Sequence, residues 1–126
     1  MPNPPIQVYI VDDEPSICTA YARLARSVKM QPRTFASVED LMQAEITDDN
    51  ACVIADVQLP KSSGLELPTL LQLAGHRLPV IFITAHDTPE ARRQARLVGA
   101  AGYFRKPVDD QALLDAIDWA VNGQRP

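Results

Sequence analysis

The sequence predicts an α/β fold in which a doubly wound parallel sheet of five strands is covered by five helices. Two observations support this prediction. Short apolar runs begin near residues 6, 33, 52, 80 and 101, and helical periodicity follows each of them. Strands that alternate with helices across short loops favour βαβ units and a parallel sheet with helices on both faces. We expect the 126 residues to form a single domain over 1–126, with its core at about 6–121.

Three strands and two helices are expected in the first half of the chain. The first and third strands are apolar runs that end at an aspartate, a pattern typical of strands buried on both faces. The first helix has Pro15 near its start and apolar residues at helical spacing, and Pro32 ends it. Ser37, three residues before Asp40, resembles a capping signal for the second helix. The expected bounds are strand 6–11, helix 15–29, strand 33–35, helix 37–44 and strand 52–55.

Two strands and three helices are expected in the second half. Pro68 fits the first turn of a helix, where its missing N–H costs little. Pro79 opens the most apolar strand, and Asp87-Thr88-Pro89 begins a helix that Gly99 stops. The expected bounds are helix 67–74, strand 80–83, helix 87–98, strand 103–104 and helix 109–121.

Composition excludes several classes of protein. A net charge of −4 argues against direct binding of nucleic acid by this chain, because phosphate contacts need a basic face. No apolar run approaches the ~20 residues of a membrane span, and the first five residues do not form a signal peptide. Cys18 and Cys52 are too few for a disulfide scaffold, so we expect reduced thiols in a cytoplasmic protein without membrane contact.

Polar residues stand where the predicted strands end. These residues are Asp12 and Asp13, Asp56, Thr84 and Lys106. Ligands of open parallel α/β sheets bind beyond the carboxyl ends of the strands, so we expect these side chains to converge. Carboxylates suit Mg²⁺, while a hydroxyl and an ammonium can neutralise the oxygens of a phosphoryl group. The sequence therefore predicts a site for Mg²⁺ and a phosphoryl group.

Each of these residues also has a simpler interpretation when it is taken alone. Asp13 could cap the helix that begins at Pro15, and Asp56 could be a turn aspartate. Thr84 could cap or fill the end of a strand, and Lys106 could be a solvated surface lysine. It is the occurrence of all of them at strand ends that favours one common site.

Four segments resemble, in order and spacing, the response-regulator receiver domain of two-component signalling: VYIVDDEPSI, VIADVQLPKSSGLEL, PVIFITAHD and GAAGYFRKPVD. The resemblance covers about residues 6–121 and implies a sheet in the order 2-1-3-4-5. It implies that Asp56 accepts the phosphoryl group, and that Asp13, Asp56 and the backbone carbonyl of Gln58 hold Mg²⁺. Asp12 would act mainly through metal-bound water.

The same resemblance assigns further roles around the acceptor. Thr84 matches the switch hydroxyl and Tyr103 the switch aromatic, while Lys106 matches the lysine that binds phosphoryl oxygens. It also implies a cis peptide bond between Lys106 and Pro107. Gln58 and His86 match the two positions nearest the phosphoryl group, where they could tune hydrolysis; for His86 a solvated loop position is the simpler interpretation.

The implied function is that of a phosphorylation-activated receiver. A sensor histidine kinase or a phosphotransfer protein would supply the phosphoryl group, and the chain would catalyse only its own phosphorylation and dephosphorylation. The face made of the fourth helix, fifth strand and fifth helix would then control an output domain or partner. The segments RTFASVEDL and VIFITAHD resemble receivers of nitrogen-fixation-type transcriptional regulators, so the chain is either a stand-alone receiver or the N-terminal domain of such a regulator.

Two other functions are less consistent with the sequence. An aspartyl-phosphate phosphohydrolase on the same fold is the main alternative, but the haloacid-dehalogenase type needs a second acidic residue where this chain has Asp56-Val57-Gln58. Flavin or nucleotide binding would need a phosphate-cradling loop, and neither GxGxxG nor GxxxxGK[ST] occurs.

Charged residues crowd the last two predicted helices. Solvated helix faces explain them most simply. The alternative is a homodimer in which the basic helix of one copy meets the acidic helix of the other. The residues concerned are Arg92, Arg93 and Arg96 on the first of these helices, and Asp109, Asp110, Asp115 and Asp118 on the second.

Overall fold

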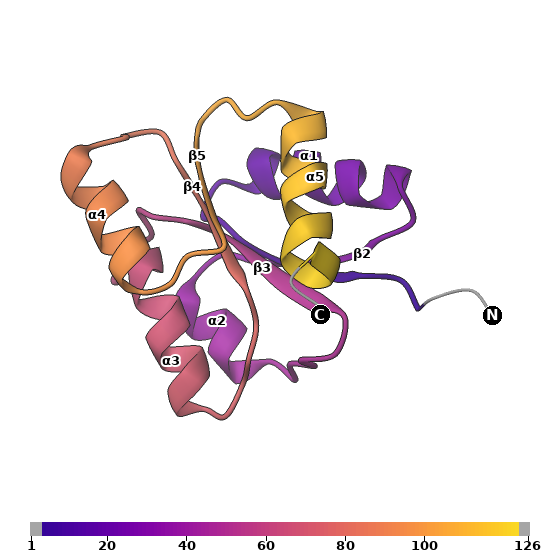
Figure 1. The fold of residues 1–126 in the computed structure, drawn as a ribbon, viewed down its shortest axis with the longest axis horizontal. Helices are drawn as coiled ribbons and strands as arrows, with labels where there is room; N and C mark the ends of the chain where they lie inside the picture. Colours follow the sequence, from indigo (N-terminus) through magenta and orange to yellow (C-terminus); the bar gives the residue numbers. More distant parts are fainter. Residues whose placement is uncertain (1–3, 124–126) are drawn as a thin grey trace.

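The computed structural model describes residues 4–123 and shows one sheet of five parallel strands (Figure 1). The strands lie in the order β2-β1-β3-β4-β5, which confirms the expected α/β fold and its strand order. The bounds are β1 Gln7–Val11, β2 Gln31–Phe35, β3 Ala51–Asp56, β4 Val80–Thr84 and β5 Gly102–Arg105.

Helices cover both faces of this sheet. Figure 1 shows α1 and α5 on one face and α2 and α3 on the other, with α4 beside β4 and β5. None of the helices within residues 4–123 is both long and apolar enough to cross a bilayer. The bounds are α1 Pro15–Ser27, α2 Val38–Gln43, α3 Leu67–Leu73, α4 Pro89–Leu97 and α5 Asp110–Asp118, with a 3₁₀ turn at Gly64–Glu66 and a π-helical turn at Trp119–Gly123.

The core consists of two apolar layers that the sheet separates. Side chains of a strand alternate between the two faces, so Tyr9, Val53 and Phe82 pack toward α2, α3 and α4, while Ile10 and Ile54 pack toward α1 and α5. Each fully buried aliphatic or aromatic side chain contributes about 1.5–3 kcal/mol to the free energy of unfolding. These two layers hold the strand ends, and therefore the polar residues there, in a fixed relative position.

The structure corrects several expected boundaries. The first helix ends at Ser27, well before Pro32, and Pro32 lies inside β2, where it is opposite Val8 of β1. β2 is an edge strand, so a residue without an N–H is tolerated there. The final helix ends at Asp118 rather than at residue 121 and continues as the π-helical turn.

Two of the site residues also lie differently from the prediction. Asp56 and Thr84 are the last residues of β3 and β4, not residues that follow them. Asp56 is paired with Ile83 in the ladder between these strands. The backbone of the sheet therefore fixes both side chains directly.

Candidate functional site

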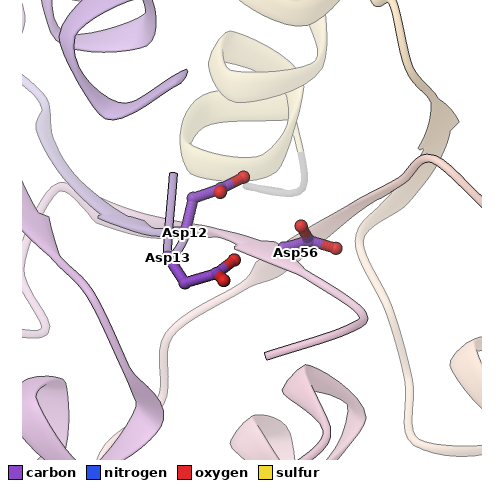
Figure 2. Close-up of side chains that lie close together, drawn as sticks. All are labelled: Asp12, Asp13 and Asp56. Carbon is purple, nitrogen blue, oxygen red and sulfur yellow. The ribbon is translucent and has the colours of Figure 1, made fainter. Parts of the chain in front are cut away.

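Three carboxylates gather at the carboxyl edge of the sheet. Asp12 and Asp13 directly follow β1, and Asp56 ends the neighbouring strand β3 (Figure 2). One oxygen of each carboxylate lies within 4.8 Å of the others. Asp12 and Asp56 are buried, whereas Asp13 is exposed. The three aspartate side chains therefore lie close together, as the sequence predicted.

Lys106 joins this group from beyond the end of β5. Its Nζ donates to Asp12 Oδ2 at 3.0 Å and to Asp56 Oδ2 at 2.9 Å. Its side chain is only 12% exposed, so the interpretation as a solvated surface lysine is wrong. The backbone N–H of Lys106 donates to the carbonyl of Thr84 at 2.8 Å, and the peptide bond between Lys106 and Pro107 is cis. The lysine is therefore held across the edge of the sheet, with its charge between two carboxylates.

Burial and charge compete at these groups. Burial by itself would lower the pKa of Lys106, but the hydrogen bonds to Asp56 and Asp12 outweigh it and raise this pKa. Burial raises the pKa of Asp12 by more than the Glu14 N–H and Lys106 lower it. The ammonium is consequently a stable charge, while the carboxylate of Asp12 lies in a place that disfavours its ionised form.

Backbone N–H groups hold the two buried carboxylates in orientation. Gln58 N donates to Asp56 Oδ1 at 3.0 Å, and Glu14 N donates to Asp12 Oδ1 at 2.9 Å. Asp56 therefore makes the turn contact that its simpler interpretation proposed, and it makes this contact inside the site. The capping role considered for Asp13 is wrong, because the residue at the N-cap of α1 is Glu14. The carboxylate of Asp13 remains accessible at the rim of the site.

Thr84 lies at the same edge, with its hydroxyl facing the loop that follows β4. Its side chain is buried, and its Oγ1 accepts the N–H of His86 at 3.0 Å. His86 and Gln58 are exposed, so both side chains are accessible to solvent. The simpler position expected for His86, a solvated loop, agrees with this exposure.

Tyr103 lies apart from the carboxylates, on β5 opposite Phe82 of β4. Its hydroxyl donates to Asp87 Oδ1 at 3.2 Å, and the Arg92 guanidinium lies 6.0 Å from the centre of its ring. The sequence does not predict the contacts of Asp87 and Arg92 with Tyr103, because Tyr103 is remote from both in sequence and meets them only when α4 packs beside β5.

Gly64 lies at the site, although the sequence predicts no role for it. A Cβ atom there would lie 1.9 Å from the carbonyl oxygen of Asp56, so any side chain would push the loop away from β3. The Gly64 N–H donates to the carbonyl of Val57 at 2.8 Å. This close approach anchors the loop after Asp56. The sequence offers as a signal only a glycine eight residues after the strand-end Asp56.

The donor set at the carboxyl edge fits Mg²⁺. All three clustered side chains offer carboxylate oxygens, which are the ligands that this cation takes in proteins. Two of them are fixed by backbone N–H groups and one is free at the rim, so Asp12, Asp13 and Asp56 are the residues that could hold the ion.

The opposite edge of the sheet has a cavity of about 760 Å³. His76 lies three residues beyond α3, as expected for a residue near a helix end, and its Nδ1 is 2.6 Å from Asp48 Oδ1. The backbone N–H of Arg77 donates to Asp48 Oδ2 at 3.1 Å. The lining of this cavity includes none of the predicted site residues.

The chain is similar to known proteins in both sequence and fold. The family model of the response regulator receiver domain matches residues 8–118. The transcriptional regulatory protein TdiR of Thauera aromatica is 37% identical over 90% of this chain and 50% of its own length. The regulator FixJ of Azorhizobium caulinodans is 30% identical over 89% of this chain and 53% of its own length. A receiver protein from Pseudoalteromonas atlantica has a TM-score of 0.84 and 28% identity, covering 94% of this chain and 99% of that one.

The curated relatives extend beyond the part that matches this chain. The chain spans about half the length of the curated relatives it matches. The resemblance to nitrogen-fixation-type regulators is confirmed by the match to FixJ. The functions of the unmatched parts belong to those regulators and are not assigned to this chain.

Proposed function

The chain belongs to the response regulator receiver family of two-component signalling proteins, and from this premise we propose that Asp56 accepts a phosphoryl group. The observation that carries the proposal is the position of Asp56 in the sheet. Because β3 lies between β1 and β4, Asp56 lies between the acidic pair Asp12 and Asp13 on one side and Thr84 on the other. Lys106 adds a positive charge at 2.9 Å from Asp56 Oδ2.

The reaction is a displacement at phosphorus. An oxygen of the ionised Asp56 forms a bond to phosphorus, and the bond from phosphorus to the donor breaks. In a phosphohistidine that bond is P–N, and its electron pair stays on the imidazole. The main obstacle is repulsion between the carboxylate and the phosphoryl oxygens, and the Lys106 ammonium offsets it because its charge already lies at the edge of the acceptor.

Mg²⁺, when bound, supplies further positive charge next to the phosphoryl oxygens. We propose that Asp13, Asp56 and the backbone carbonyl of Gln58 hold it, and that Asp12 acts on it through water. Asp12 and Asp56 are kept in place for this by the N–H groups of Glu14 and Gln58.

Phosphorylation would change the switch face through Thr84. We propose that the Thr84 hydroxyl leaves the His86 N–H and donates to a phosphoryl oxygen, which draws the loop after β4 toward Asp56. Tyr103 would then turn inward, and the surface formed by α4, β5 and α5 would change. Such a response is a shift between two populated states, biased by the new charge on Asp56. Gln58 and His86 are both exposed, and their backbone N–H groups bind Asp56 and Thr84; from these positions they would tune hydrolysis of the acyl phosphate.

The partners follow from this chemistry. We propose a sensor histidine kinase or a phosphotransfer protein as the donor, acting in the cytoplasm, where free thiols such as Cys18 and Cys52 stay reduced. Relatives named as transcriptional regulators support control of an output domain or partner, and they favour signalling over phosphohydrolase activity.

A homodimer through α4, β5 and α5 is the second interaction that we propose. The exposed arginines of α4 and the exposed aspartates of α5 are complementary in charge. Sedimentation at several concentrations, with and without a phosphate mimic, tests this. A mass that increases with concentration when the mimic is present supports the dimer, and a monomer under both conditions contradicts it.

The acceptor is tested with Asp56→Asn, which keeps the shape of the side chain but removes its nucleophilic charge. We expect acetyl phosphate and Mg²⁺ to label the wild-type protein with an acid-labile phosphoryl group and to leave this variant unlabelled. Glu90→Gln, which changes an exposed carboxylate on α4, is the matched control and should label like the wild type. Equal labelling of Asp56→Asn and the wild type would show that Asp56 is not the acceptor.

A further inference from the structure

The side chains of Asp87, Arg92 and Tyr103 form a connected group that lies outside the phosphoryl site. Asp87 lies in the short loop 85–88 between β4 and α4, Arg92 lies on α4, and Tyr103 lies on β5. The Tyr103 hydroxyl donates to Asp87 Oδ1 at 3.2 Å, and Arg92 Nε donates to the same oxygen at 2.7 Å. A second bond joins Arg92 Nη2 to Asp87 Oδ2.

This group is more constrained than an ordinary surface ion pair. Arg92 binds both oxygens of Asp87, a geometry that orients the carboxylate as well as neutralising it. The Asp87 side chain is only 12% exposed, and the Arg92 guanidinium lies 6.0 Å from the centre of the Tyr103 ring, within the range of a cation–π contact. The ring is thus held by one hydrogen bond at its hydroxyl and one contact at its face.

A neighbouring ion pair on the same helix shows the difference. Arg93 Nη2 lies 2.7 Å from Glu90 Oε2, and both side chains are mostly exposed, at 66% and 57%. Asp87, Arg92 and Tyr103 all line a surface pocket between α4 and β5. Neither Arg93 nor Glu90 is among the residues that line this pocket. Glu90 therefore provides a matched carboxylate that pairs with an α4 arginine without holding the tyrosine.

We propose that Asp87 and Arg92 are positioning residues that hold Tyr103 against the loop after β4 in the unphosphorylated protein. This inference rests on the proposed function, in which Tyr103 moves when Asp56 is phosphorylated. We call the three residues Asp87, Arg92 and Tyr103 the tyrosine latch.

The latch is linked to the phosphoryl site through the chain itself. Asp87 is three residues after Thr84, and the Thr88 side chain caps α4 by accepting the Ala91 N–H at 3.0 Å. Because the loop between these two fixed points is short, a movement of Thr84 toward Asp56 must also move Asp87. The carboxylate that holds the Tyr103 hydroxyl would then be withdrawn, and the ring would be free to turn.

The energetic consequence is a bias toward the resting state. A ligand or modification shifts a two-state equilibrium only by its differential interaction with the two states. Contacts made only in the resting state therefore oppose the switch, and removing them should increase the population of the switched state. Loss of one partly exposed hydrogen bond of ordinary net strength corresponds to an increase of about threefold to tenfold in that population.

The position of the ring is tested without any phosphorylation. Tyr9, Tyr21 and Tyr103 are the three tyrosines of the chain, so fluorotyrosine labelling gives three ¹⁹F resonances, of which Tyr103→Phe identifies one. We expect Asp87→Ala and Arg92→Ala to move the Tyr103 resonance in the same direction, and Glu90→Ala to leave it in place. The buried Tyr9, whose hydroxyl accepts the Thr47 N–H at 2.9 Å, reports that each variant is folded. A Tyr103 resonance that is the same in Asp87→Ala and Glu90→Ala would overturn the latch.

The bias on the switch is tested by the rate of labelling with acetyl phosphate and Mg²⁺. We expect Asp87→Ala to label about threefold to tenfold faster than both the wild type and Glu90→Ala, because more of it is in the switched state. If the wild type is labelled and Asp87→Ala is labelled at the same rate, the latch is overturned. The proposed function is not contradicted by that result. Failure of the wild type to label would overturn the proposed function, while the ¹⁹F spectra would still decide whether Asp87 and Arg92 hold the ring.

Discussion

The carboxylates at the carboxyl edge and at the amino edge of the sheet have different surroundings. At the carboxyl edge, Asp12, Asp13 and Asp56 have oxygens within 4.8 Å of one another, and Lys106 lies between two of them. At the amino edge, Asp48 has partners for both of its oxygens, His76 on one and the Arg77 N–H on the other. The first edge concentrates like charges, whereas at the second edge both oxygens of Asp48 have hydrogen-bond partners.

The pKa values of Asp12 and Asp48 are shifted in opposite directions, in agreement with this contrast. Burial raises the pKa of Asp12, while the hydrogen bond with His76 lowers the pKa of Asp48. The carboxyl edge therefore carries three carboxylates against one ammonium, that of Lys106, and this excess of negative charge favours the binding of a cation such as Mg²⁺.

The largest effect is expected from removing the positive charge of Lys106 from the carboxyl-edge cluster. Lys106→Met should lower the free energy of unfolding by about 2–3 kcal/mol at neutral pH in the presence of a chelator, because two buried carboxylates lose their shared counter-charge. Urea denaturation measures this, with Arg105→Met as the control, since Arg105 is an exposed cation next in sequence. Equal stability of the two variants would contradict the contrast between the edges.

A smaller effect is expected from the exposed member of the acidic cluster. Asp13→Asn should weaken Mg²⁺ binding to the unphosphorylated protein by about tenfold, since one charged ligand of a hard cation becomes neutral. Calorimetric titration with Mg²⁺ gives the dissociation constant directly. Asp48→Asn should bind Mg²⁺ like the wild type, and an equal loss in both variants would show that Asp13 has no special place in the site.

The smallest effect is expected at the amino edge. The pKa of Asp48 is lowered in the folded protein, so its contribution to stability is present above its unfolded pKa and is lost as the pH falls through the folded value. Because the Asp48 side chain is 39% exposed, Asp48→Asn should cost less than about 1 kcal/mol at neutral pH. Urea denaturation at neutral and acidic pH should show this cost shrinking on acidification; a cost that grows would mean that the sign is wrong.

Much of the fold was open to prediction because its signals are local. The apolar runs that end at Asp12, Asp56 and Thr84 mark buried strands, and the Ser37 side chain caps α2 by accepting the Asp40 N–H at 3.0 Å, as its spacing predicted. Pro32 misled the prediction, because a proline also fits an edge strand. Local patterns do not show which strand lies at the edge, and that order came only from the family resemblance.

The core of the site was predictable for a related reason. In a parallel sheet all strand ends of one kind lie on one edge, so residues at those ends must meet. Gly64 and Asp87 were missed because their roles depend on how a loop or a helix packs. Gly64 matters through its closeness to the Asp56 carbonyl, and Asp87 through the positions of Arg92 and Tyr103, contacts that no spacing in the sequence encodes.

The most direct measurement of the central proposal is the position of the acyl phosphate among three neighbouring carboxylates. Borohydride reduces an aspartyl phosphate to homoserine, and peptide mapping then locates the changed residue. After treatment with acetyl phosphate and Mg²⁺, homoserine is expected at position 56 and at no other aspartate. Homoserine at position 12 or 13 would contradict the assignment of Asp56 as the acceptor.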